Sequence, residues 1–179
     1  DLLSDAATWA DSLGTLPSGS QLDMDDDGYL DSVTFIVSGD ATGWNDLLWP
    51  HMWATDYYHR PEINGKIMYQ FDFQLEEFED VKSDAVGTYT HEMMHMLGFP
   101  DLYRYYMNGT PVGSWDVMAS TATVPQYASA FMRYIVAGWG KAPEELTSLD
   151  QEVSVERPGT NGSSPTSYYR KMVNGGWLV

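Results

Sequence analysis

The chain has 179 residues, of which 43% are hydrophobic and 14% aromatic, enough to bury the core of one ordinary domain. Nine lysines and arginines stand against 26 aspartates and glutamates, and the net charge is −17. This balance argues against nucleic acid and anionic membrane surfaces as partners, because both are bound by basic faces. The chain has no cysteine, which excludes disulfides and thiolate zinc sites, and no apolar run long enough for membrane insertion.

The first half of the chain predicts one helix and two strands. Apolar residues at helical spacing favour a helix over residues 1–13, which Gly14 closes. Residues 32–39 form a short β-rich run that we expect to be a buried strand. The aromatic-rich stretch 44–65 contains two prolines and is interpreted as a loop, and the alternating pattern of 66–76 predicts a second strand.

The strongest helical pattern begins at Ser83, which can cap it, and ends at Gly98, a natural stop. Its core-facing stripe is predicted to consist of Val86, Met93 and Leu97. Another helix is expected over about 126–137. Residues 152–159 and 167–179 are interpreted as edge strands or as a C-terminal appendage.

Two of the four histidines, His91 and His95, lie four residues apart on the predicted central helix, and Glu92 follows the first. Residues four apart share a helix face, so both imidazoles can hold one metal ion. Glu92 is rotated by about 100° and would lie beside that ion, where its carboxylate can take a proton from water. The pattern is that of HExxH zinc peptidases, with a chance match on a solvated helix face as the alternative.

A catalytic zinc ion needs a third protein ligand. No histidine follows His95, and the nearest downstream acids are Asp101 and Asp116. We rank Asp101 first, because Gly98 lets the chain leave the helix sharply and turn that residue back towards the metal. Asp116 ranks second, and a turn or capping role is the alternative for Asp101.

The other two histidines lie upstream and are the least favoured candidates for the third ligand. His51 stands among Trp49, Pro50 and Trp53. It is interpreted either as a residue of the substrate cleft or as one histidine in a buried aromatic cluster, and the cluster is favoured. His59 has no motif around it that assigns it a role.

An acidic loop, DMDDDGYLD, occupies residues 23–31. Its spaced carboxylates belong to Asp23, Asp25, Asp27 and Asp31. Together with the Tyr29 carbonyl they could wrap a calcium ion, with Gly28 at the turn. The twelfth position is Thr34 and a strand follows, so the loop is a calcium-loop fragment and not an EF-hand. The alternative is a solvated turn.

Several motifs in a fixed order resemble the immune inhibitor A family of secreted bacterial metallopeptidases, metzincin-like zinc enzymes with the pattern HExxHxxGxxD. The motifs are THEMMHMLGFPDLY at 90–103, GSWDVMAS at 113–120, PQYASAFMRYIVAGW at 125–139, DMDDDGYLDSVTFIVSG at 23–39 and NDLLWPHMW at 45–53. The chain departs from the family at Met94, where glycine is common, and at Arg104, where aspartate is common. These departures suggest different packing and a differently shaped cleft.

The resemblance implies a role for each matching residue. His91, His95 and Asp101 match the zinc ligands, and Glu92 matches the general base and acid. Met118 matches the methionine of the Met-turn, a tight turn beneath the metal site, although a core methionine would look the same.

We therefore predict an α/β (α+β) fold of the zincin or metzincin type in a single domain over 1–179. An upper part to about residue 98 would carry a small twisted sheet and the active-site helix, and a lower part over 99–179 would carry the Met-turn. The expected function is that of a secreted, monomeric zinc endopeptidase with calcium as a second metal, excised from a longer protein. The alternatives are an inactive, calcium-stabilised binding or adhesion module that retains the zinc site, and a metal hydrolase for other bonds.

Overall fold

The computed structural model describes residues 2–39, 49–76, 85–107, 109–139, 142–148, 150–153, 169–173 and 176–178. The elements are α1 (Leu2–Ser12), α2 (Gly19–Leu22), β1 (Thr34–Val37), β2 (His51–Ala54), β3 (Glu62–Ile63), β4 (Lys66–Ile67), β5 (Gln70–Leu75), α3 (Ala85–Met96), α4 (Ala130–Ile135), β6 (Glu144–Glu145), β7 (Tyr169–Val173) and β8 (Gly176–Leu178). They fall into two compact units, Asp1–Met96 with Ala122–Val124 and Leu97–Thr121 with Pro125–Val179. None of the helices in the described ranges is long and apolar enough to cross a membrane.

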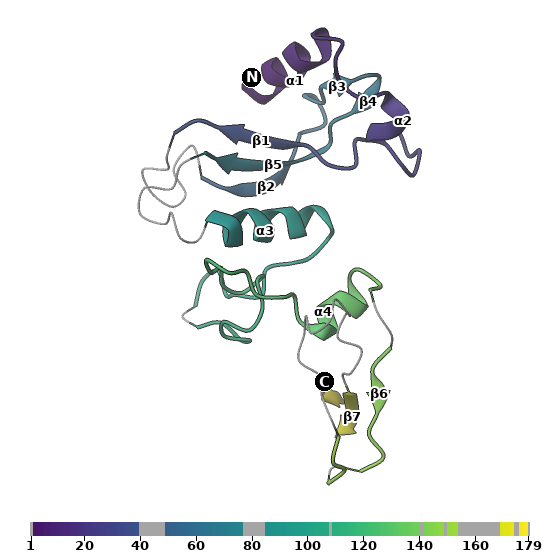
Figure 1. Ribbon diagram of the computed structural model, residues 1–179, viewed down its shortest axis with the longest axis vertical. Helices are drawn as coiled ribbons and strands as arrows, with labels where there is room; N and C mark the ends of the chain where they lie inside the picture. Colours follow the sequence, from purple (N-terminus) through teal and green to yellow (C-terminus); the bar gives the residue numbers. More distant parts are fainter. Residues whose placement is uncertain are drawn as a thin grey trace. The chain divides into compact units, whose positions relative to one another are not determined.

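The first unit is built on a three-stranded sheet in the order β1–β5–β2, with β1 parallel and β2 antiparallel to the central strand (Figure 1). Side chains of a strand alternate between its two faces. Phe71, Phe73 and Leu75 of β5 therefore share one face, where they pack against Leu3 of α1. The opposite face is covered by α3, so β5 is buried on both sides (Figure 1).

A second small core joins α1 to the hairpin β3–β4. Its buried members are Ala7, Leu30, Ile63 and Met68. The hairpin turns at Asn64 and Gly65, which both have positive φ, as a two-residue Asn-Gly turn requires. The Asn64 N–H donates to Oδ1 of Asp11 at 2.6 Å, which ties this turn to the end of α1.

Several predicted elements of this unit are present. The helix over 1–13 is confirmed as α1, and Gly14 follows it with φ +63°. The strand within 32–39 is confirmed as β1, but the expectation that it is buried is wrong. It is an edge strand, and Ile36 on its outer side is 68% exposed.

The loop interpretation of residues 44–65 holds at 49–50, 55–61 and 64–65 and is wrong at two strands. Residues 51–54 form β2 and residues 62–63 form β3, while 44–48 lie outside the described residues. The strand β2 is defined by its ladder with β5, a long-range pairing that local composition does not reveal. The single strand predicted over 66–76 is confirmed in part, because it is divided into β4 and β5, which belong to different sheets.

The predicted active-site helix is α3, and Gly98 ends it with φ +87°. Its expected cap, Ser83, lies outside the described residues. The predicted core stripe is wrong, because Val86, Met93 and Leu97 are 57%, 53% and 54% exposed. The buried positions of the helix are instead Gly87, His91 and Glu92, so α3 turns its site residues inward.

In the second unit the helix predicted over 126–137 is shorter, and α4 begins after Ser129, whose side chain caps the Met132 N–H. The strand β7 pairs in parallel with β6 and antiparallel with β8, which confirms strands within 167–179. The other predicted edge strand, over 152–159, is absent at 152 and 153, and its remainder lies outside the described residues.

Candidate metal centre

The helix α3 places the two histidines of the HExxH motif side by side. Nε2 of His91 lies 3.2 Å from Nε2 of His95, and the two ring planes are perpendicular. Two nitrogens that each bind a tetrahedral zinc ion at about 2.0–2.1 Å lie about 3.3 Å apart. The observed separation therefore fits two ligands of one metal ion.

Asp101 lies with these histidines. One nitrogen of His91, one nitrogen of His95 and one carboxylate oxygen of Asp101 all lie within 4.8 Å of one another and could hold a metal ion. Gly98 ends α3 three residues earlier in a left-handed conformation that glycine adopts at low cost. The Tyr105 hydroxyl donates a hydrogen bond to Oδ2 of Asp101, which orients the carboxylate.

Asp116, the second candidate for the third ligand, has a different environment. It is fully buried. Its Oδ1 accepts the Met118 N–H at 2.8 Å, and its Oδ2 accepts the Ser129 N–H at 2.6 Å. Both oxygens thus hold backbone segments of the second unit, and this geometry makes Asp116 an anchor.

Met118 lies in a tight turn and its side chain is fully buried. The N–H groups of Ala119 and Ser120 both donate to the Asp116 carbonyl, which closes the turn. The Met118 carbonyl accepts the Leu102 N–H at 2.8 Å. This last hydrogen bond ties the turn to the residue that follows Asp101.

Glu92 is held from the sheet side. Its Oε2 accepts the backbone N–H of Met52, in the edge strand β2, at 2.9 Å. Burial raises the pKa of the Glu92 carboxyl, while the charges of His91 and His95 and the Met52 N–H act in the opposite direction. The HExxH pattern predicts Glu92 but not its donor, because Met52 lies in a segment that was predicted to be a loop.

A second carboxylate, which no sequence motif predicted, lies in the central strand β5. Asp72 is fully buried and pairs in the ladder with Met52. Its Oδ1 accepts the Gln74 side-chain N–H at 2.7 Å, and its Oδ2 accepts the Thr34 hydroxyl at 3.3 Å. Burial raises the pKa of Asp72. An aspartate between two phenylalanines in a predicted strand was the signal that could have revealed it.

The acidic loop brings one oxygen each of Asp23, Asp25 and Asp27 within 4.8 Å of one another. The buried Asp23 carboxylate accepts the N–H groups of Asp27 at 3.1 Å and Gly28 at 2.9 Å. Its Oδ2 also lies 2.6 Å from Nζ of Lys66, and this contact lowers the pKa of Asp23. The ammonium group of Lys66, on β4, therefore already contacts the loop, a long-range contact that the acidic pattern does not predict.

The other two residues predicted for calcium have contacts within the loop. Oδ2 of Asp31 accepts the Met24 N–H at 3.0 Å, and the Tyr29 N–H donates to Oδ1 of Asp27 at 2.9 Å. Asp31 does not belong to the three-residue group of Asp23, Asp25 and Asp27.

The upstream histidines do not belong to the group of His91, His95 and Asp101. The His51 ring stacks on Phe73 with centroids 5.5 Å apart, and its Nδ1 lies 2.6 Å from the Trp49 carbonyl oxygen. These contacts favour the aromatic-cluster interpretation of His51. His59 is exposed and its Nδ1 lies 2.8 Å from a carboxylate oxygen of Asp56.

Residues 19–131 match the family model described as immune inhibitor A peptidase M6, catalytic domain. The matched span covers the acidic loop, the three-stranded sheet, α3 and the turn with Met118. No curated protein and no solved structure matched the chain. Because the family match covers more than half of the chain and includes the helix that carries the paired histidines, the chain belongs to the immune inhibitor A family of metallopeptidases.

Proposed function

We propose that this domain is a zinc-dependent endopeptidase. Membership of the family makes it a metallopeptidase, with proteins or peptides as substrates. The observation that supports zinc is the pair of Nε2 atoms 3.2 Å apart, grouped with a carboxylate oxygen of Asp101. Two imidazole nitrogens and one carboxylate oxygen are a ligand set that zinc takes in catalytic sites, where a further position is kept for water or substrate.

A zinc ion held by these residues would lower the pKa of a water molecule and polarise the scissile carbonyl. Glu92 directly follows His91 on α3, so its carboxylate lies next to the histidine pair. The Met52 N–H holds Oε2, and we assign Oε1 to proton transfer. Glu92 accepts a proton from the attacking water and then gives it to the leaving amine, which restores the carboxylate.

Asp116 and Met118 receive supporting roles in this proposal. The buried Asp116 carboxylate holds the N–H groups of Met118 and Ser129, and the Met118 carbonyl holds the segment that follows Asp101. Met118 would thus correspond to the Met-turn methionine of metzincins, with a structural contribution and no part in proton transfer.

We further propose that the domain acts outside a bacterial cell on extracellular proteins. The support is the resemblance to secreted enzymes together with the acidic composition. The test is fractionation of the native host, in which the protein is expected in the culture medium. Recovery in the cytosol alone would contradict this part of the proposal.

Calcium in the acidic loop is a separate proposal, supported by the closeness of Asp23, Asp25 and Asp27. A calcium ion would have to displace Lys66 from Asp23, since Nζ already lies 2.6 Å from Oδ2. The test is thermal unfolding in calcium and in EGTA. A higher melting temperature in calcium is expected, and equal temperatures would contradict calcium binding.

Zinc dependence is tested by chelation and reconstitution. The protein is treated with a strong chelator, dialysed and assayed on casein before and after zinc is added back. Activity is expected to disappear on chelation and return with about one zinc ion per chain. Full activity in protein without bound metal would contradict the proposal.

A further inference from the structure

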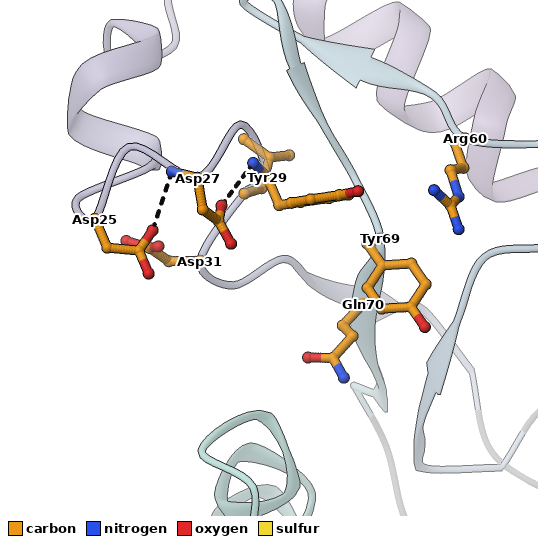
Figure 2. A pocket seen from close by; sticks show the side chains of 8 residues that line it. Asp25, Asp27, Tyr29, Asp31, Arg60, Tyr69 and Gln70 are labelled. Atoms are coloured by element: carbon orange, nitrogen blue, oxygen red, sulfur yellow. Dashed lines mark hydrogen bonds between the residues drawn. The ribbon is translucent and has the colours of Figure 1, made fainter. Parts of the chain in front are cut away.

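A cavity of about 560 Å³ opens in the first unit, where β5 begins (Figure 2). One side carries the carboxylates of Asp25, Asp27 and Asp31, which come from the acidic loop and are all exposed. In Figure 2 they gather at one end of the cavity, and Arg60 lies at the other. Three carboxylates against one guanidinium leave the lining negatively charged.

Aromatic rings lie between these two ends. The rings of Tyr29 and Tyr69 have centroids 5.8 Å apart, and Tyr69 is 40% exposed. The Arg60 guanidinium lies 5.0 Å from the ring centroid of Tyr69 and 5.2 Å from that of Tyr57. The Arg60 side chain lines the cavity, so its guanidinium can donate to an oxygen of a ligand there.

The cavity lies close to the proposed base. Gln70, which lines it, pairs with Ala54 of β2, and two residues along the same ladder Met52 pairs with Asp72. Met52 is also the residue whose N–H holds Glu92. Two residues of a strand span about 7 Å. A side chain within a few residues of the scissile bond in an extended substrate can therefore reach the cavity.

We propose that this cavity is a subsite for a lysine or arginine side chain of the polypeptide substrate. The ammonium or guanidinium group would meet Asp25, Asp27 and Asp31, and the exposed face of Tyr69 would line its path. Arg60 would donate to a backbone carbonyl of the same substrate segment. The net charge of −17 attracts basic segments over a longer range. The inference rests on the proposed endopeptidase function and names its substrate class.

Calcium is the alternative cation at this end of the cavity. It would engage Asp25 and Asp27 and reduce the charge that a basic side chain meets. A basic subsite therefore predicts that the preference for lysine is strongest in EGTA and weaker when calcium is added. Measurements in both conditions distinguish the two occupants.

The first arm measures binding without turnover. Labelled peptides that differ only by lysine, norleucine or glutamate at each position in turn are titrated into the zinc-loaded Glu92→Ala protein in EGTA. At one position, lysine is expected to bind about tenfold more tightly than norleucine, and glutamate more weakly than both. Equal binding of lysine and norleucine at every position would overturn the inference, whether or not the parent cleaves any peptide.

The second arm assigns the preference to the cavity. Asp31→Asn and Asp25→Asn are each expected to reduce the preference for lysine about threefold, because each removes one charge near the cation. Glu144→Gln removes one exposed charge outside the cavity, on β6, and is expected to leave the preference unchanged. A preference that survives both cavity substitutions, or that falls equally in the control, would overturn the assignment.

The third arm compares kcat/KM for the same peptides with the parent protein. Cleavage of all peptides without a preference for lysine would overturn the subsite and leave the peptidase intact. Binding that prefers lysine without cleavage would support the cavity as a cation subsite and contradict the proposed peptidase function.

Discussion

Asp101 and Asp116 both follow the histidine pair, and their surroundings favour Asp101 as the proposed metal ligand and Asp116 as an anchor. Asp101 has an oxygen within 4.8 Å of one nitrogen of His91 and one nitrogen of His95, while Asp116 is buried and accepts two backbone N–H groups. A carboxylate that already holds two backbone donors cannot turn to a metal without leaving those donors unsatisfied.

Asparagine at each position tests this assignment. Asp101→Asn is expected to lose most of its bound zinc, with little change in the stability of the metal-free protein. Asp116→Asn is expected to keep zinc and to lose roughly 1–3 kcal/mol of unfolding free energy, because its NH2 group cannot accept a backbone N–H. Metal analysis and urea unfolding measure both. Zinc loss in Asp116→Asn at unchanged stability would reverse the assignment.

Asp72 illustrates how burial of a carboxyl affects stability. Burial raises the pKa of Asp72 above its ordinary value, so the folded state binds the proton more tightly than the unfolded state. Stability contributed by the protonated form is therefore lost as the pH rises from the unfolded pKa, about 4, through the raised folded pKa.

Asp72→Asn is expected to raise the melting temperature at pH 8, and the gain should shrink as the pH falls towards 4. The amide keeps both neighbours, since its oxygen can accept from Gln74 and its NH2 group can donate to the Thr34 hydroxyl. Melting curves of the metal-free proteins across this pH range measure the difference. A gain that is equally large at pH 4 would show that the buried charge is not its cause.

At the scale of elements, α3 approaches another segment of the first unit very closely at Gly87. A Cβ atom on Gly87 would lie 2.4 Å from the Ala122 carbonyl oxygen and 2.8 Å from the Ala122 nitrogen. Both are backbone atoms, which cannot move aside as a flexible side chain can. Glycine is therefore required here in spite of its low helix propensity.

Gly87→Ala is expected to destabilise the protein by roughly 1–3 kcal/mol through overpacking. At an open helical position the same change would stabilise by about 0.8–1 kcal/mol, so the sign of the effect identifies the contact. Met93→Ala on the exposed side of α3 is the control and is expected to change stability by less than about 0.5 kcal/mol. Urea unfolding measures the free energy of unfolding of both variants. A Gly87→Ala protein more stable than the parent would contradict the close packing.

Elements with a local signal could be predicted from the sequence, and elements defined by partners could not. The helical spacing of apolar residues predicts α1 and α3, and the alternation of apolar and polar residues predicts β5. The strand β2 forms because it pairs with β5, and the outward turn of Val86, Met93 and Leu97 follows from the sheet that α3 packs against. A hydrophobic spacing of three and four residues identifies a helix but does not say which of its faces is covered.

The same division holds for the candidate site. His91, Glu92 and His95 lie within two turns of one helix, so their geometry follows from the helical period. Asp101 follows from a glycine turn three residues earlier. The Met52 N–H and the Lys66 ammonium each contact a partner at least 40 residues away, Glu92 and Asp23, and no local pattern encodes such a contact.

For the whole molecule, metal binding and stability are expected to be coupled. A ligand that binds only the folded state stabilises it in proportion to the logarithm of its concentration over Kd. Zinc at His91, His95 and Asp101 is therefore expected to raise the melting temperature of the parent, and chelation is expected to lower it. Asp101→Asn should show a much smaller shift. An equal shift in both proteins would place the stabilising metal elsewhere.

The most direct test of the endopeptidase proposal is casein hydrolysis by the parent and by Glu92→Ala, side by side, with the zinc content of each recorded. We expect the parent to cleave casein and Glu92→Ala to bind the same amount of zinc while losing activity by a factor of about 10² or more. Cleavage by Glu92→Ala at the parent rate would contradict the assignment of Glu92 as the base. Two zinc-loaded proteins that both fail to cleave would contradict the peptidase function of this chain and favour a binding module.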